Sequence, residues 1–326
     1  MNRSALLFLV KILVSLGLLL FLLSQVDLSK LLQAITSAHL SYLVLILVSY
    51  ILSQFVSCFR WVLLARPLGF RLPFKEFLSF YFIGMFFNLF APSTVGGDVG
   101  RVFYLARGVN QTQEIHWTGR TGTALISVLA DRAIGLAVLV WIGAVALALF
   151  SNYPLPVIVR YLTFALAVGF FLGWMLLPFL SRFLEWVKYP LIKNLVAGLE
   201  IYWRNQKIIL QTITLSLIVH FVQAWMQILL GRSLDLEIPW SYCFILYPLV
   251  GVFSALPISL NGIGLREFGF KYLLEQIDVS SEKAIAFGLL WFIMVALDSL
   301  IGGVVFILRK SPKPSAIVPE IKNQAR

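Results

Sequence analysis

Long apolar runs separated by short basic loops dominate the chain. Six of these runs are long enough to cross the roughly 30 Å hydrocarbon core of a membrane as helices. They cover residues 5–24, 40–64, 124–150, 161–180, 208–230 and 284–308. The pattern therefore predicts a polytopic helical membrane protein.

Two further apolar segments are interrupted by proline and glycine. The first contains the sequence NLFAPSTVGGDVGR over residues 88–101, and the second contains ALPISLNGIGLRE over residues 255–267. Non-helical backbone at membrane depth persists only where protein or a water-filled cavity satisfies its polar groups. A pair of interrupted segments in corresponding places of two halves points to a transport site.

The two interrupted segments match position by position. Counted from the proline of each, a hydroxyl residue, a glycine and an arginine occupy the second, fifth and ninth places: Pro92, Thr94, Gly97 and Arg101, and then Pro257, Ser259, Gly262 and Arg266. An intramembrane aspartate follows each, Asp131 after 30 residues and Asp298 after 32. Because proline and glycine are common in membrane helices, coincidence is the alternative explanation.

Basic residues set the expected topology. Arg3 precedes the first span, and the loops after residues 64, 101 and 180 are rich in lysine and arginine, which places them in the cytoplasm by the positive-inside rule. The N- and C-termini are then cytoplasmic, and the two interrupted segments enter from opposite faces. We therefore expect an all-α membrane protein with about six full transmembrane helices and two re-entrant helical hairpins in an inverted repeat. The alternative is that one or both of these hairpins cross the whole membrane.

The predicted domain organisation is a single integral membrane domain over residues 1–310. Its first half covers about 40–150 and its second half about 208–308, joined by a basic, aromatic-rich linker over 181–207 that suits the membrane interface. Residues 311–326 are rich in Pro, Lys and Asn and read as a disordered cytoplasmic tail.

Composition supports the membrane class. The chain has 60% hydrophobic and 13% charged residues, whereas soluble domains average about 25% charged. The net charge of +11 reflects basic loops rather than a nucleic-acid surface. Cys58 and Cys243 lie in apolar stretches without metal-ligand spacing, so we expect no metal and no cofactor.

Several polar residues fall inside the apolar runs. In the second span Ser49, Ser53, Ser57 and Arg60 share one helical face, and Arg60 is also expected to belong to the basic cytoplasmic loop that follows. Asp131 and Arg132 lie about two turns into a span, where function and a structural ion pair are equally good explanations. His220 shares a face with Gln223 and Gln227, which favours a helix-to-helix hydrogen bond over a proton relay.

The two motifs suggest an anion site. Broken helix ends and backbone amides favour a negative group, and arginine offers a planar fork that fits phosphate. Acidic residues nearby could bind a cationic headgroup or neutralise the arginines. The candidate substrate-binding residues are Asn88, Thr94, Gly97, Asp98, Arg101, Asp131 and Arg132 in the first half, and Asn261, Gly262, Arg266, Glu267 and Asp298 in the second.

The same residues resemble a known family. NLFAPSTVGGDVGR, the ADR at residues 130–132 and PISLNGIGLRE are similar to the transmembrane region of lysylphosphatidylglycerol synthases and of related flippase-like proteins, over roughly residues 11–308. In those synthases this region is implicated in moving aminoacylated phosphatidylglycerol between leaflets, and a separate soluble domain makes the lipid. The resemblance implies lipid movement and does not imply lipid synthesis.

Three functional hypotheses follow. The first is a non-enzymatic lipid translocator in the cell (inner) membrane, acting on anionic, aminoacylated or polyprenyl-linked lipid, with membrane phospholipid as the substrate and no nucleic-acid partner. The second is an enzyme on lipid phosphate that uses Asp98 or Asp131 as acid or base. The third is an accessory subunit. A homo-oligomer and a lipid-modifying enzyme are the alternatives for protein partners.

Overall fold

The structure is a computed structural model that describes residues 3–90, 95–108, 119–184, 198–256 and 258–309, and no strand occurs among them. The helices are α1 (Arg3–Ser24), α2 (Leu28–Thr36), α3 (Leu40–Ala65), the short 3-10 turn η1 (Arg66–Leu68), α4 (Phe74–Phe90), α5 (Val95–Gly108), α6 (Gly119–Leu149), α7 (Val157–Leu184), α9 (Gln206–Ser233), α10 (Trp240–Ser254), α11 (Leu265–Glu275) and α12 (Ser281–Leu308). The all-α prediction is confirmed. The predicted tail at 311–326 lies outside the described residues.

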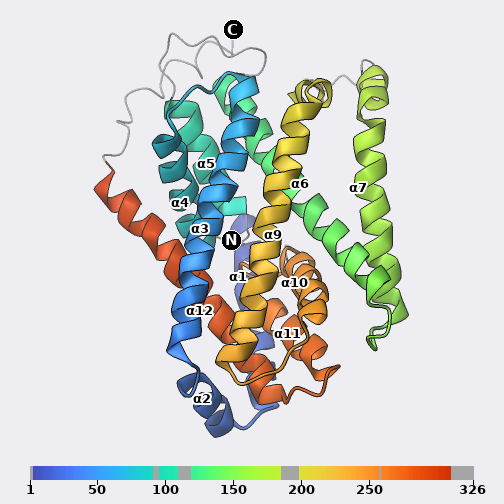
Figure 1. Cartoon of the computed structure of the whole chain (residues 1–326). Helices are drawn as coiled ribbons and strands as arrows, with labels where there is room; N and C mark the ends of the chain where they lie inside the picture. Colours follow the sequence, from blue (N-terminus) through green and yellow to red (C-terminus); the bar gives the residue numbers. More distant parts are fainter. Residues whose placement is uncertain (1–2, 91–94, 109–118, 185–197, 257, 310–326) are drawn as a thin grey trace.

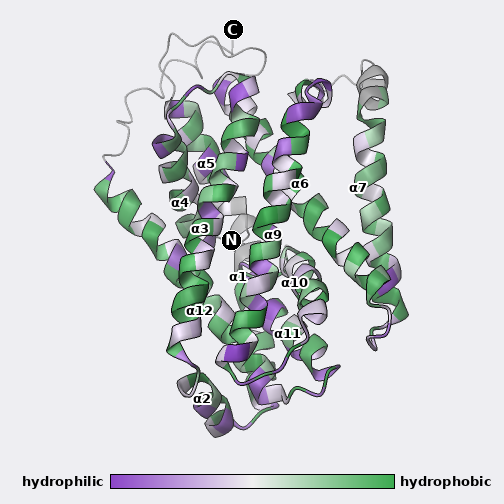
Figure 2. Cartoon of the chain, viewed as in Figure 1, coloured by the Kyte–Doolittle hydropathy of each residue, from purple (hydrophilic) through white to green (hydrophobic). Residues whose placement is uncertain are grey.

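Long apolar helices make the chain a multi-pass membrane protein. In the part of the chain that the structure describes, five helices can each cross a membrane, and the bent pair α1 and α2 raises the number to six. All six agree with the apolar runs of the sequence. Figure 2 shows mostly apolar residues along α7 and α12, and α7 exposes many of them, including Val168, Phe171 and Met175. Faces of this kind suit contact with lipid.

Most of the segment between the first two spans is the helix α2. The chain turns by 98° between α1 and α2. The Asp27 side chain caps α2 by accepting a hydrogen bond of 2.8 Å from the backbone N–H of Ser29, the usual role of an aspartate at this position. Hydrogen bonds from the Ser29 hydroxyl and backbone lower the pKa of the Asp27 carboxyl.

Helices α3 and α9 form an antiparallel pair through the middle of the molecule. At one end His39 N–H donates to the Ser233 carbonyl at 2.9 Å, and towards the other end Arg60 Nη1 donates to Ser216 Oγ at 2.9 Å. Figure 1 shows α4 and α5 beside the upper end of this pair and α10 and α11 beside the lower end. The two interrupted segments therefore lie at opposite ends of one helical framework.

Each interrupted segment folds as two antiparallel helices. In the first, Phe80 of α4 stacks on Tyr104 of α5 with ring centroids 5.6 Å apart, while nearer the tip Gly97 N–H donates to Asn88 Oδ1 at 2.8 Å. In the second, the rings of Phe253 and Phe268 lie 6.5 Å apart. We call these pairs the first hairpin (α4 and α5) and the second hairpin (α10 and α11).

Each hairpin is braced by an element that is distant in sequence. A Cβ at Gly302 of α12 would overlap the carbonyl of Phe82 in α4, so the two backbones are in direct contact. At the other hairpin, Ser15 Oγ of α1 accepts a 2.8 Å hydrogen bond from Leu260 N–H. The first hairpin therefore depends on the last helix, and the second hairpin depends on the first helix.

The buried apolar side chains form two clusters, one for each hairpin. One cluster contains Trp61, Phe77 and Leu105 and joins the first hairpin to α3 and α6. The other contains Leu246, Phe270 and Phe287 and joins the second hairpin to α9 and α12. Apolar packing thus supports each hairpin separately.

Candidate functional site

The first half is held together by a buried carboxylate between two arginines. Asp131 Oδ1 of α6 accepts from Arg60 Nε at 2.8 Å, and its Oδ2 accepts from Arg101 Nη2 at 2.8 Å. Asp131 is 2% exposed, Arg101 5% and Arg60 7%. Because each carboxylate oxygen has an arginine, this arrangement ties α3, α5 and α6 together by charge.

Aromatic rings enclose the Arg101 guanidinium. Its carbon lies 4.1 Å from the centroid of Trp61 and 4.7 Å from that of Tyr81, which are cation–π distances. Its Nε is buried and has no hydrogen-bond acceptor among the described residues. Gly84 of α4 makes room for this side chain, since a Cβ there would lie 2.7 Å from Arg101 Cγ.

A second carboxylate extends this cluster towards the surface of α6. Asp98 Oδ1 accepts a 3.1 Å hydrogen bond from Arg132 Nε, and Asp98 Oδ2 lies 2.8 Å from the same nitrogen. Asp98 Oδ1 also lies 3.6 Å from Arg101 Nη1. The side chain of Arg132 is 43% exposed. Three arginines and two aspartates therefore form what we call the arginine cluster: Arg60, Arg101, Arg132, Asp98 and Asp131. Its formal charge is positive.

In the second half the matching arginine pairs with its own neighbour. Arg266 Nη2 donates to Glu267 Oε1 at 2.8 Å, and Glu267 Oε2 accepts from Gly264 N–H at 2.6 Å at the start of α11. The Arg266 guanidinium also lies 5.0 Å from the ring of Phe292. Glu267 therefore both caps the helix and neutralises Arg266.

The turn before α11 explains the asparagine and glycines of the second motif. Asn261, Gly262 and Gly264 have φ values of 47°, 78° and 83°, a left-handed conformation that glycine and asparagine adopt most readily. The geometry gives Asn261 and Gly262 a backbone role in this turn.

Asp298 is the exception among the charged residues of the site. It is fully buried in α12 at 0% exposure. Neither of its carboxylate oxygens has a hydrogen-bond partner among the described residues. The buried Ser259 Oγ of the second motif is unpaired in the same sense.

Tyrosines and a histidine connect helices of the two halves. Tyr50 of α3 packs on Trp291 of α12 with ring centroids 5.9 Å apart. The Tyr247 hydroxyl lies 2.9 Å from His220 Nδ1, and His220 Nε2 lies 2.9 Å from the Gly135 carbonyl. His220 thus links α9 to α10 and α6 by hydrogen bonds, which is the helix-to-helix role that the sequence favoured.

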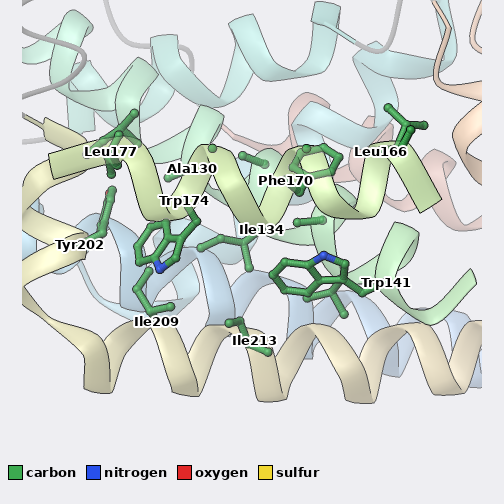
Figure 3. Close-up of a pocket in the computed structure, with 17 residues that line it drawn as sticks. Ala130, Ile134, Trp141, Leu166, Phe170, Trp174, Leu177, Tyr202, Ile209 and Ile213 are labelled. Carbon is green, nitrogen blue, oxygen red and sulfur yellow. The ribbon is translucent and has the colours of Figure 1, made fainter. Parts of the chain in front are cut away.

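An apolar groove runs along the other side of α6. Figure 3 shows side chains of α6, α7 and α9 lining it, with Trp141 and Trp174 pointing into the space between the helices. Its volume is about 470 Å³, and its walls include Ala130, Ile134 and Phe170. Ala130 precedes Asp131, so one turn of α6 contacts both the groove and the arginine cluster.

The structure brings together only part of the residue set predicted from sequence. Arg101, Asp98, Asp131 and Arg132 form one cluster, whereas Arg266 and Glu267 form a separate pair. Asp298 has no hydrogen-bond partner among the described residues. Asn88 contacts Gly97 through a hydrogen bond, and Thr94 lies outside the described residues.

Assigning Arg60 to a cytoplasmic loop was wrong, because it is buried in α3 against Asp131. Its place on the same helical face as Ser53 and Ser57 was the sequence pattern that could have indicated a position inside the span. No local sequence pattern indicated that Trp61 and Tyr81 would contact Arg101.

Comparison with known proteins assigns the chain to a family. A search of curated proteins found no match. The model of the family described as "Lysylphosphatidylglycerol synthase TM region" matches residues 8–302, nearly the whole chain, and this protein therefore belongs to that family.

Proposed function

We propose that this protein moves a phosphate-bearing membrane lipid between the two leaflets of the cell membrane and does not act as an enzyme. Lipid phosphate binds at the arginine cluster, with Arg101 as the central contact. The observation that carries the proposal is the buried Arg101 Nε, a donor with no acceptor among the described residues, in a cluster of three arginines and two aspartates.

The unpaired donor of Arg101 favours an anion. Arg60 and Arg101 share the single carboxylate of Asp131, and a buried guanidinium is costly unless its donors are paired. A phosphate oxygen at Arg101 Nε would supply the missing acceptor and add negative charge. Arginine binds phosphate in this way with one to two charge-assisted hydrogen bonds.

The groove suits the apolar part of the same ligand. From Ala130 to Trp141 it follows α6 for about 17 Å at 1.5 Å per residue. That length is close to half of the roughly 30 Å hydrocarbon core, which is the depth of one leaflet. An amphiphile could place its headgroup on one side of α6 and an acyl chain on the other.

The order of elements supports movement between leaflets. Each half contains a long helix, a hairpin and another long helix, namely α3 to α6 and α9 to α12. The leading helices α3 and α9 are antiparallel, as an inverted repeat requires. We infer that the hairpins are re-entrant from opposite faces, with both termini in the cytoplasm, so that each half can open the site to one leaflet.

The test is leaflet exchange in liposomes that contain the purified protein. Labelled phosphatidylglycerol is the probe, and a labelled glycosphingolipid without phosphate is the comparison lipid. We expect wild-type protein to exchange the first lipid faster than the second. Arg101→Gln should slow exchange at least about tenfold, because a hydrogen bond to a charged group contributes about 1.5–3 kcal/mol.

Two variants control for folding and for surface charge. Arg101→Lys keeps the positive charge next to Asp131 but loses the fork, and it should exchange lipid at an intermediate rate. Arg232→Gln removes an exposed arginine at the end of α9 and should behave as wild type. Equal rates for Arg101→Gln and Arg232→Gln, both folded, would contradict the proposal.

The same liposomes separate the other functions. An enzyme acting on lipid phosphate would convert the probe into a new lipid, which mass spectrometry of the extract detects. An accessory subunit would exchange no lipid while remaining folded. Either result would replace the translocator proposal.

A further inference from the structure

Asp298 combines complete burial with the lack of a partner. It lies ten residues before the end of α12, which is about 15 Å along the helix axis and near the middle of a membrane. Both of its oxygens lack hydrogen-bond partners in the described part of the chain. A carboxylate in such a place costs several kcal/mol when it is ionised, and the neutral acid costs much less.

The corresponding aspartate of the first half has the opposite surroundings. Asp131 pairs with Arg60 and Arg101, and Arg101 lies between Asp98 and Asp131. Arg266 occupies the place of Arg101 in the second motif, but in this conformation it contacts Glu267 and not Asp298. The second half therefore contains the corresponding arginine and aspartate, but the two do not form an ion pair in this conformation.

Other titratable groups on the helices packed around this part of α12 could share a proton with Asp298. Tyr50 of α3 packs on Trp291 of α12, and α2 brings Lys30, which is exposed. Other described helices that pack on α12 carry Tyr81 (α4), His220 (α9), and Arg266 and Glu267 (α11). Among these, His220 is held by Tyr247 and Gly135, and Glu267 by Arg266 and Gly264.

We propose that Asp298 is a proton-binding site that couples lipid movement to a transmembrane proton gradient. In the conformation described here Asp298 carries the proton. In the alternative conformation Arg266 lies between Glu267 and Asp298, as Arg101 lies between Asp98 and Asp131. The proton then leaves the Asp298 oxygen for water, and the carboxylate that remains is paired with Arg266.

This coupling rests on the proposed lipid translocation, but the proton site can be tested separately. Infrared spectroscopy of the purified protein at neutral pH reports the carbonyl band of a protonated carboxyl group. We expect the band in wild type, its loss in Asp298→Asn, and its retention in Asp278→Asn. Asp278 is an exposed aspartate in a left-handed turn, a conformation that asparagine also adopts. An unchanged spectrum in folded Asp298→Asn would overturn the proton site.

The coupling itself is tested in liposomes with an imposed pH gradient. Wild type should exchange lipid faster with the gradient than without it, whereas Asp298→Asn should exchange at the rate without a gradient under both conditions. Stimulation by the gradient in Asp298→Asn, or stimulation of wild type by a sodium gradient alone, would overturn proton coupling. Absence of lipid exchange in wild type would instead contradict the translocator, and the infrared result would still stand.

Discussion

The two halves of the molecule use the same residue types in different ways. In the first half Asp131 receives both an arginine of α3 and an arginine of the first hairpin. In the described part of the second half, no arginine pairs with Asp298, and Arg266 is neutralised by the adjacent Glu267. A motif match therefore does not imply a matching interaction.

The difference suggests distinct mechanical roles. The first hairpin is fixed to α3 and α6 by buried charge, and such pairs are expensive to separate. The described ion pairs of the second hairpin lie within α11, so it can shift without breaking an ion pair to another described helix. We expect the second hairpin to move during transport while the first remains in place.

The largest expected effect is at Asp131. Asp131→Asn would leave the buried Arg60 and Arg101 without their shared carboxylate, and breaking a buried pair in this way costs about 3–5 kcal/mol. The midpoint of thermal unfolding in mild detergent measures the loss. The exposed Asp278→Asn should unfold as wild type, and a midpoint for Asp131→Asn equal to that control would mean that the arginine cluster does not stabilise the fold.

A smaller effect separates the packing of the two hairpins. Gly97→Ala would place a Cβ on the carbonyl of Gly84, and overpacking of this kind costs about 1–3 kcal/mol. Gly269→Ala in the second hairpin would meet Val250 at 3.4 Å, an ordinary contact, and alanine favours a helix by about 0.8–1 kcal/mol over glycine. The midpoint of thermal unfolding should therefore fall for Gly97→Ala, and it should stay equal or rise for Gly269→Ala. The reverse order would contradict the closer packing of the first hairpin.

The smallest effect is expected at Asp298. Asp298→Asn replaces a neutral acid by a neutral amide of similar shape and removes no ion pair, so stability should change by less than about 1 kcal/mol. The same unfolding measurement applies. A loss as large as that of Asp131→Asn would show that Asp298 is charged and paired in the native state.

Local sequence was sufficient for the spans and insufficient for the site. The apolar run over 40–64 predicted α3 (Leu40–Ala65) because burial in lipid requires a continuous apolar helix, and proline and glycine marked both hairpin tips. Arg60 was misplaced because its partner Asp131 lies 71 positions away, and a charge near a helix end normally faces water. Only the fold reveals such a long-range pair.

The contact between Gly302 of α12 and the carbonyl of Phe82 has a consequence for biogenesis. The first hairpin is synthesised early, but the helix that covers this side of α4 is the last one described in the chain. Until α12 is inserted, that surface of α4 must face lipid, an insertase or another chain. A protein truncated before α12 would thus contain every residue of the arginine cluster and still lack the support that holds its hairpin.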